Sequence, residues 1–155
     1  MKTRKGLGFT LVELIVVIIL LAIISAYAAS RYIGVGSFSA FAIQDSVISV
    51  ARQVQLNRMQ SNTSALNDSF VLSLSANCIG SKQSCTTPSD SRSDWVSDDS
   101  VSFSATPNIN AIEFDLLGNP LGTASAGVAI AIQASNSRAV VSICPNGLIS
   151  TSGCF

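Results

Sequence analysis

The chain has 155 residues, of which 48% are hydrophobic and 12% are charged, and its nine basic and nine acidic residues give a formal net charge of zero. This length fits one domain of ordinary size, and this composition excludes an intrinsically disordered chain. The sequence contains no histidine, so Ser-His-Asp, Cys-His and zinc-protease sites would lack their central residue. No basic cluster indicates a nucleic-acid-binding surface. We therefore expect no catalytic centre, no metal and no cofactor.

Residues 9–29 form an apolar run that is interrupted only by Thr10, Glu13 and Ser25. As a helix rising about 1.5 Å per residue, this run would be about 31 Å long, which is enough to span a bilayer. Three of the nine basic residues lie within residues 1–8. Their position predicts that these first residues stay in the cytoplasm while the rest of the chain crosses the membrane.

A cleavable secretory signal is the main alternative for this run. The start is basic, the middle is apolar, and Ala26-Tyr27-Ala28 has the small-x-small form of a signal peptidase site, so cleavage after Ala28 would release a soluble binding domain. Glu13 argues against this reading, because an acidic residue in a membrane helix costs up to about 3 kcal/mol and a disposable signal gains nothing from it. The apolar helical pattern also continues from Phe41 to Arg58.

The residues Gly8-Phe9-Thr10-Leu11-Val12-Glu13 follow a short basic leader. This arrangement resembles the signature of type IV prepilins, in which the leader ends in glycine, phenylalanine begins the mature chain and glutamate is its fifth residue. The resemblance implies that a prepilin peptidase cuts between Gly8 and Phe9 and that the new amine of Phe9 is N-methylated. It also implies that the helix is kept as a membrane anchor and later as the core of a filament.

The same resemblance gives Glu13 a role in filament assembly. An isolated carboxylate is penalised in lipid, whereas a carboxylate paired with a cation is not. Removal of the leader creates an ammonium group at Phe9, so Glu13 of an incoming chain would pair with the Phe9 amine of a chain already packed. The alternative is that Glu13 is a polar residue tolerated near the start of the helix.

After Gln60 the sequence becomes polar, so we expect the helix to end there. The runs that follow with near alternation, and that read as strands, are Phe70–Leu74, Val101–Phe103, Ala111–Phe114, Val128–Gln133 and Ala139–Cys144. We predict an α+β fold in which a long N-terminal helix packs through its C-terminal half on a small antiparallel β-sheet. The predicted parts are a leader (1–8), a transmembrane or filament-core helix (9–29), its amphipathic continuation (30–61) and a β-sheet head (62–155).

Two segments carry weaker expectations. Gly34 and Gly36 each cost a helix about 1 kcal/mol relative to alanine, so any flexure should lie there. Ser81–Ser100 is rich in serine and aspartate, and we expect a surface loop in which Trp95 is buried against the head or, alternatively, anchors a partner. Its acids are expected to be solvated rather than calcium ligands, and they are Asp90, Asp94, Asp98 and Asp99.

The four cysteines allow three pairings, and the sequence does not choose among them. Pairing the nearest neighbours, Cys78 with Cys85 and Cys144 with Cys154, is favoured because it closes short loops. Each such disulfide would contribute on the order of 2.5 kcal/mol. The spacings fit no zinc knuckle or ribbon, so structural disulfides in an exported chain are expected.

The last third of the chain carries a second resemblance. A run ending in Phe114-x-x-x-Gly118 and a later Asn146-Gly147 turn are similar to the C-terminal pattern of the H-type pseudopilins and related minor pilins. Glu113 and Asp115 could be read as a pair of catalytic carboxylates, but their spacing in a strand predicts that both face solvent.

These features together predict a structural, minor subunit of a type IV pilus and not an enzyme. The alternative is a pseudopilin of a type II secretion system. The expected partners are other pilin subunits, prepilin peptidase and the inner-membrane assembly platform, and the expected location is the inner membrane before assembly. Loss of the leader leaves six basic residues against nine acidic ones, which disfavours nucleic acid as a partner.

Overall fold

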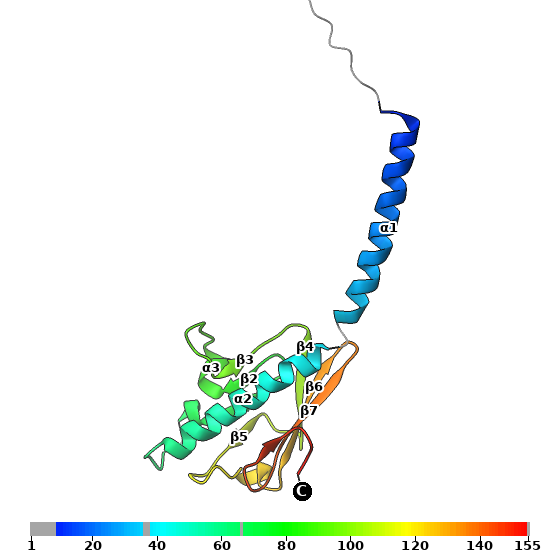
Figure 1. Ribbon diagram of the computed structural model, residues 1–155. Coiled ribbons are helices and arrows are strands. Elements are labelled where there is room, and N and C mark those ends of the chain that lie inside the picture. The colour runs from blue at the N-terminus through cyan, green and yellow to red at the C-terminus, as the bar shows by residue number, and fades with distance from the viewer. Residues whose placement is uncertain (1–8, 36–37, 66, 155) are drawn as a thin grey trace, which may run out of the picture. The chain divides into compact units, whose positions relative to one another are not determined.

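The structure is a computed structural model that describes residues 9–35, 38–65 and 67–154. The chain divides into two compact units, Met1–Val35 and Gly36–Phe155, which are described separately (Figure 1). The flexure expected at Gly34 and Gly36 falls at this division. Helix α1 ends at Val35, helix α2 begins at Ser39, and Gly36 lies outside the described residues.

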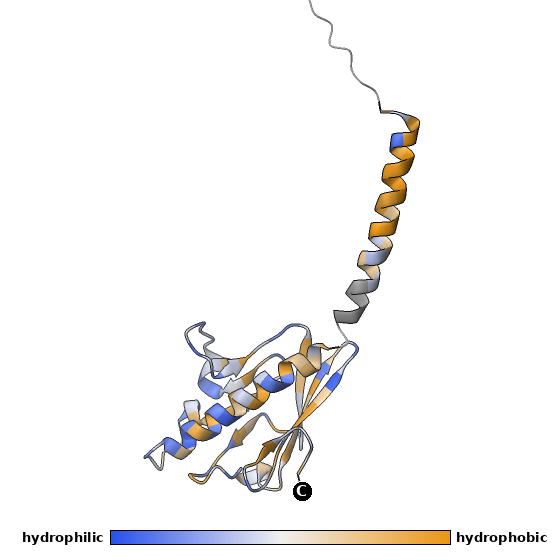
Figure 2. Cartoon of the chain, viewed as in Figure 1, coloured by the Kyte–Doolittle hydropathy of each residue, from blue (hydrophilic) through white to orange (hydrophobic). Residues whose placement is uncertain are grey.

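In the part of the first unit that the structure describes, residues 9–35, there is one helix, α1 (Leu11–Val35). Leucine, isoleucine, valine and alanine fill most of its first 20 positions, so over this length the helix is apolar on every side apart from Glu13 (Figure 2). All side chains of residues 11–30 are exposed. A helix that is apolar all round requires an apolar environment, either a membrane or the interior of an assembly.

The second unit is built around helix α2 (Ser39–Gln60), which ends at the predicted position. One face of the helix is buried, and its buried residues are Ala40, Val47, Val50, Ala51, Val54 and Arg58. The predicted apolar stripe is therefore confirmed over most of its length. Phe41 is the exception, because its side chain is 53% exposed. Ala40 occupies the buried position at this end of the helix instead.

Two four-stranded sheets form the β region, and all their strand pairs are antiparallel. The first sheet has the order β3 (Trp95–Val96), β2 (Ile79–Ser81), β1 (Val71–Leu74) and β5 (Ala111–Glu113). The second sheet has the order β4 (Val101–Thr106), β6 (Val128–Ala134), β7 (Arg138–Ile143) and β8 (Ile149–Ser150). The α+β class is confirmed, and the antiparallel region consists of two sheets rather than one.

The five predicted strands correspond to β1, β4, β5, β6 and β7, whereas β2, β3 and β8 were not predicted. The expectation of a bare surface loop over Ser81–Ser100 was wrong, because this stretch contains a short helix, α3 (Lys82–Thr86), and the strand β3. Short 3₁₀ turns lie at η1 (Asp68–Phe70) and η2 (Gly122–Ala124).

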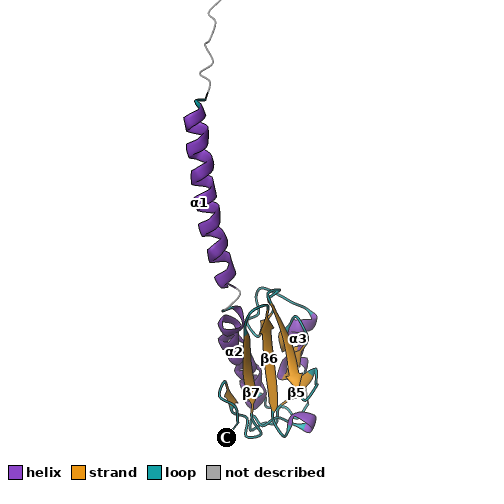
Figure 3. Cartoon of the chain, turned by 90° about the vertical axis from the view of Figure 1, so that its right-hand side faces the viewer, coloured by secondary structure: helices purple, strands orange, loops and turns teal. Residues whose placement is uncertain are grey.

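The core lies between α2 and the two sheets (Figure 3). Its largest fully buried apolar side chains are Phe114, Leu72, Ile79, Ile112, Ile130, Ile132, Ile143, Val47, Val54 and Val141. Burial of one such side chain contributes about 1.5–3 kcal/mol. Because both sheets contribute to this set, α2 holds the two sheets in one core.

Candidate functional site

Thr10 caps the N-terminus of α1. Its Oγ1 accepts a hydrogen bond from the backbone N–H of Glu13 at 3.3 Å, and its carbonyl oxygen accepts one from the N–H of Leu14 at 3.2 Å. Glu13 therefore lies in the first turn, where the helix dipole favours a negative charge. The local fold alone thus tolerates an acid at this position.

The carboxylate of Glu13 makes no hydrogen bond or ion pair with any residue in the described part of the chain. The neighbouring Phe9 is 78% exposed. The acid is therefore available to a cation on another molecule, as the predicted pairing requires. Gly8 lies outside the described residues, so the cleavage bond is not seen, and both the cleavage and the pairing stay predictions.

Leu11–Ser30 is the part of α1 that is long and apolar enough to cross a membrane. Its 20 residues would extend about 30 Å. The two serine hydroxyls within it are satisfied locally, because Ser25 Oγ donates to the Leu21 carbonyl at 2.7 Å and Ser30 Oγ donates to the Tyr27 carbonyl at 2.8 Å. Helix backbone with its serine hydroxyls bonded inside the helix is a form of chain that lipid accepts, and the carboxylate of Glu13 is the group in this segment that still needs a partner.

The buried face of α2 ends in a guanidinium group. Arg58 is 6% exposed, its Nε donates to the Phe114 carbonyl at 3.2 Å, and its Nη1 donates to Ser61 Oγ and to the Thr63 carbonyl at 2.9 and 2.8 Å. Oxygen acceptors thus satisfy this buried charge without a carboxylate. The side chain joins the end of α2 to the segment that follows β5.

Three further polar side chains of α2 donate to backbone carbonyls of the β region. Gln44 Nε2 donates to Val140 at 2.8 Å, and Arg52 Nη2 donates to Ile149 at 3.0 Å. Gln55 Nε2 donates to both Gly118 and Gly147 at 2.7 Å. The sequence did not predict these hydrogen bonds, because a single polar residue on a helix does not indicate which distant carbonyl it will contact.

The two cysteine pairs are joined as Cys78–Cys85 and Cys144–Cys154. This arrangement fits the favoured nearest-neighbour pairing. The first disulfide ties the start of β2 to α3, and the second ties the end of β7 to the end of the chain. Both lie in the head and hold its surface segments in place.

Asp94 is buried, contrary to the expectation that it is a solvated acid. Arg92 binds it through both oxygens, with Nε at 3.0 Å from Oδ1 and Nη2 at 2.6 Å from Oδ2. Ser84 Oγ donates to Oδ1 at 2.7 Å. The hydrogen bonds from Arg92 lower the pKa of Asp94 far below its usual range, against the opposing effect of burial. This network fixes the segment between α3 and β3.

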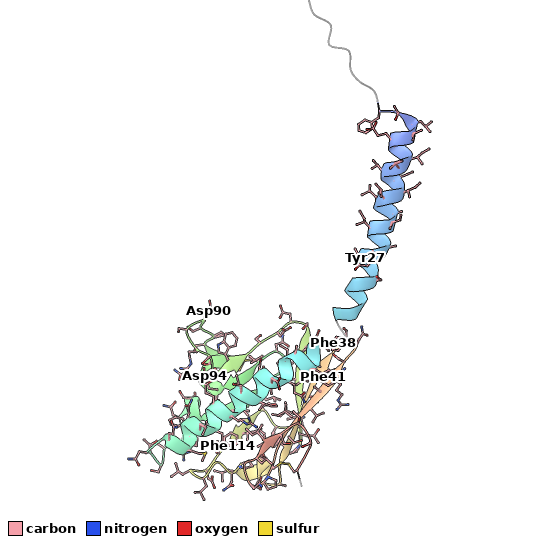
Figure 4. The ribbon with its side chains drawn as sticks, in the orientation of Figure 1. Tyr27, Phe38, Phe41, Asp90, Asp94 and Phe114 are labelled. Carbon is pink, nitrogen blue, oxygen red and sulfur yellow. A yellow bond between two sulfur atoms is a disulfide. The ribbon has the colours of Figure 1, made fainter. Side chains whose placement is uncertain are left out.

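Trp95 is half-buried, and its indole Nε1 donates to the Ser89 carbonyl at 3.3 Å. Asp90 is exposed near this indole, and Figure 4 shows it apart from Asp94. Within the described residues, no group of three or more potential metal-ligating His, Cys, Asp or Glu side chains is brought together. The acids of this segment are therefore not assembled around a common centre.

Glu113 and Asp115 were both expected to face solvent, and this is seen for Glu113 but only in part for Asp115. Glu113 is exposed on β5, whereas Asp115 is half-buried and closes the turn after that strand. Its carboxylate accepts hydrogen bonds from the backbone N–H groups of Leu117 and Asn119 at 2.9 and 2.7 Å and from Asn119 Nδ2 at 2.9 Å. Desolvation raises the pKa of Asp115, but these hydrogen bonds outweigh it and hold the pKa below its ordinary value. Asp115 thus has a structural role.

The comparisons with known proteins add one match. Residues 3–29 match the model of the prokaryotic N-terminal methylation motif. This match covers residues 3–10 and the first 19 residues of α1, and it supports a type IV pilin-like signal of the class III kind. Such a signal implies processing by a peptidase and assembly with other pilins, and it fits a chain anchored in the inner membrane. No curated protein and no solved structure matches the chain.

Proposed function

We propose that this chain is a membrane-anchored structural subunit of a type IV pilus. Prepilin peptidase cuts it between Gly8 and Phe9, the Phe9 amine is N-methylated, and the mature chain is assembled through α1. The observation that carries this proposal is the methylation motif over residues 3–29. Two observations support it, namely the exposed apolar side chains of residues 11–30 and the carboxylate of Glu13, which pairs with no residue that the structure describes. Both need partners other than the described residues.

The partners in this proposal are other pilin subunits, the peptidase and the inner-membrane assembly platform. The head faces the periplasm before assembly and the exterior afterwards. A pseudopilin of a type II secretion system is the second candidate, since the same signal and helix serve both assemblies. The Phe114-x-x-x-Gly118 and Asn146-Gly147 features favour the H-type subgroup within either class, with a resemblance to the minor pilin MshC of mannose-sensitive haemagglutinin pili.

The mature N-terminus tests the proposal directly. Protein purified from membranes of the native host is analysed by intact mass and by sequencing of its N-terminal peptide. The expected result is a chain that begins at N-methylated Phe9. A chain that begins at Ala29 would overturn the proposal in favour of a secreted domain, and Ala26-Tyr27-Ala28 lies within α1, so that cleavage would divide the helix.

A further inference from the structure

An exposed stripe of side chains runs along the outward face of α2, and we call it the outer stripe. Its members are Phe38, Phe41, Asp45, Arg52, Leu56 and Met59. They lie on one side of the helix, opposite the buried Val47, Ala51 and Val54, and all of them stay exposed, although Arg52 reaches the edge of the second sheet at Ile149. Figure 4 shows Phe38 and Phe41 together at the N-terminal end of α2.

The outer stripe has a symmetric order. Its successive spacings are 3, 4, 7, 4 and 3 residues, which read the same from either end. The chemistry along it is complementary about the midpoint between Ile48 and Ser49. Two aromatic residues and an acid lie on one side of the midpoint, and a base and two aliphatic residues lie on the other.

Two copies of α2 that run antiparallel about this midpoint place every member of the stripe opposite a matching partner. Phe38 faces Met59 of the second copy, and Phe41 faces Leu56 of the second copy. Asp45 faces Arg52 of the second copy, and symmetry repeats each pair. Contact of this kind, in which the same patch serves both subunits, is the interface of a two-fold dimer.

The charges select this arrangement over parallel ones. Parallel helices in register would place Asp45 opposite Asp45 and Arg52 opposite Arg52. A parallel shift of seven residues pairs Asp45 with Arg52 once but places Phe38 opposite Asp45. The apolar pairs supply the attraction, and the ion pairs add little affinity but fix register and orientation.

The groups that would form the ion pairs are available. The carboxylate of Asp45 has no hydrogen bond or ion pair within the described parts of the chain. Arg52 uses one Nη2 hydrogen bond, to the Ile149 carbonyl, which holds the guanidinium beside the stripe. A hollow of about 450 Å³ between α2 and β8, lined by Ile48, Arg52 and Leu148 among others, leaves room for side chains of a second copy.

We propose that the chain forms a two-fold homodimer through the outer stripe of α2, with the two helices antiparallel. The proposal does not depend on cleavage at Gly8 or on assembly into a filament.

Charge reversal in the full chain, purified in detergent micelles, tests the pairing of Asp45 with Arg52. Sedimentation equilibrium is expected to give twice the monomer mass for the wild type. Asp45→Arg and Arg52→Asp alone should each weaken the dimer by at least tenfold. A mixture of the two single variants should restore it, because both ion pairs re-form across the mixed dimer. A wild-type chain that stays monomeric, or single variants that dimerise as well as the wild type, would overturn the proposal.

A disulfide cross-link separates the antiparallel from the parallel arrangement. In the antiparallel pair, the two copies of residue 49 are offset by about 1.5 Å along the axis, against about 10.5 Å for a parallel shift of seven residues. Because all four native cysteines are in disulfides, Ser49→Cys supplies the only free thiol. Oxidised Ser49→Cys should form covalent dimer in at least fivefold greater yield than Ser46→Cys, an exposed site one turn away. Equal yields would exclude the antiparallel register.

Discussion

The carbonyl oxygens of Gly118 and Gly147 accept hydrogen bonds from the same nitrogen, Nε2 of Gln55, at 2.7 Å each. The two glycines lie in different turns, one after β5 of the first sheet and one between β7 and β8 of the second. Both have positive φ angles, of 87° and 78°. A helix residue thus joins two turns that are 29 residues apart in the sequence.

Replacement of Gln55 by alanine should lower the free energy of unfolding of the head by about 1–2 kcal/mol. The reason is that two hydrogen bonds are lost and two partly buried carbonyls lose their donor. Chemical denaturation of the full chain in detergent, followed by the fluorescence of the single tryptophan, Trp95, measures this change. Gln60→Ala, an exposed glutamine on the same helix, is the control. Equal midpoints for the two variants would show that the amide contributes nothing.

Replacement of Gly147 by alanine should destabilise the head more than replacement of Gly122. Both glycines have positive φ, which costs an alanine about 1–2 kcal/mol. A Cβ at Gly147 would also lie 2.4 Å from the carbonyl oxygen of Gly118, whereas a Cβ at Gly122 meets nothing within 4 Å. We expect the difference between the two variants to exceed about 1 kcal/mol in the same unfolding assay. If Gly122→Ala is the more costly variant, the two turns are not in close contact.

Much of this architecture follows from local patterns. The buried face of α2 follows from apolar residues at spacings of three and four, and β6 and β7 follow from alternation over six or seven residues. Strands β2 and β3 have three and two residues, which are too few to show the alternation of apolar and polar residues that indicates a strand. They are fixed by a long-range contact, because Gly80 lacks the Cβ that would lie 2.4 Å from the Trp95 backbone.

The residues of the candidate site also fall into two groups, those predicted from local sequence patterns and those whose surroundings depend on the fold. Glu13 was predicted because it belongs to a contiguous motif. The cap at Thr10 was not predicted, although the spacing of Thr10 and Glu13 is that of a capping box. Asp94 was assigned to solvent because four nearby aspartates in a serine-rich segment look alike in sequence. Only the fold distinguishes the one that meets Arg92 and Ser84 from the others. Phe41 was assigned to the core because it is a large apolar residue at the start of the apolar pattern. Its position on the helix instead places it on the exposed side, away from the buried Val47 and Val54.

Acid should destabilise the head through Asp94. Its pKa is lower in the folded chain than in the unfolded chain, chiefly because of Arg92, so the unfolded state binds more protons in acid. Its contribution is fully present above about pH 4, the pKa of an unfolded aspartate, and is lost progressively below it. Asp94→Asn should therefore cost about 2 kcal/mol at pH 7 and progressively less towards pH 2.

Unfolding midpoints measured between pH 7 and pH 2 check this expectation. Asp98 and Asp115 also have lowered pKa values, and they contribute the same acid dependence to both proteins, so the difference between wild type and variant isolates Asp94. Asp90→Asn is the control, because its exposed carboxylate has no partner among the described residues. A wild-type to Asp94→Asn difference that stays constant over this range would contradict the assignment.

Replacement of Glu13 by leucine should leave processing largely intact while reducing incorporation into filaments at least tenfold. Leucine keeps the helix and suits lipid better than a carboxylate does, so insertion and cleavage after Gly8 should proceed. The variant lacks the charge that would meet the Phe9 amine of a packed chain, and an ammonium left without a counter-ion among apolar helices is costly.

Intact mass of the membrane fraction reports processing, and immunoblots of sheared filaments report incorporation. Glu113→Leu, which removes an exposed acid on β5, should assemble as the wild type does. Normal incorporation of Glu13→Leu would refute the role of Glu13 in assembly. The acid would then contribute only to the first turn of α1, where Thr10 already caps the helix.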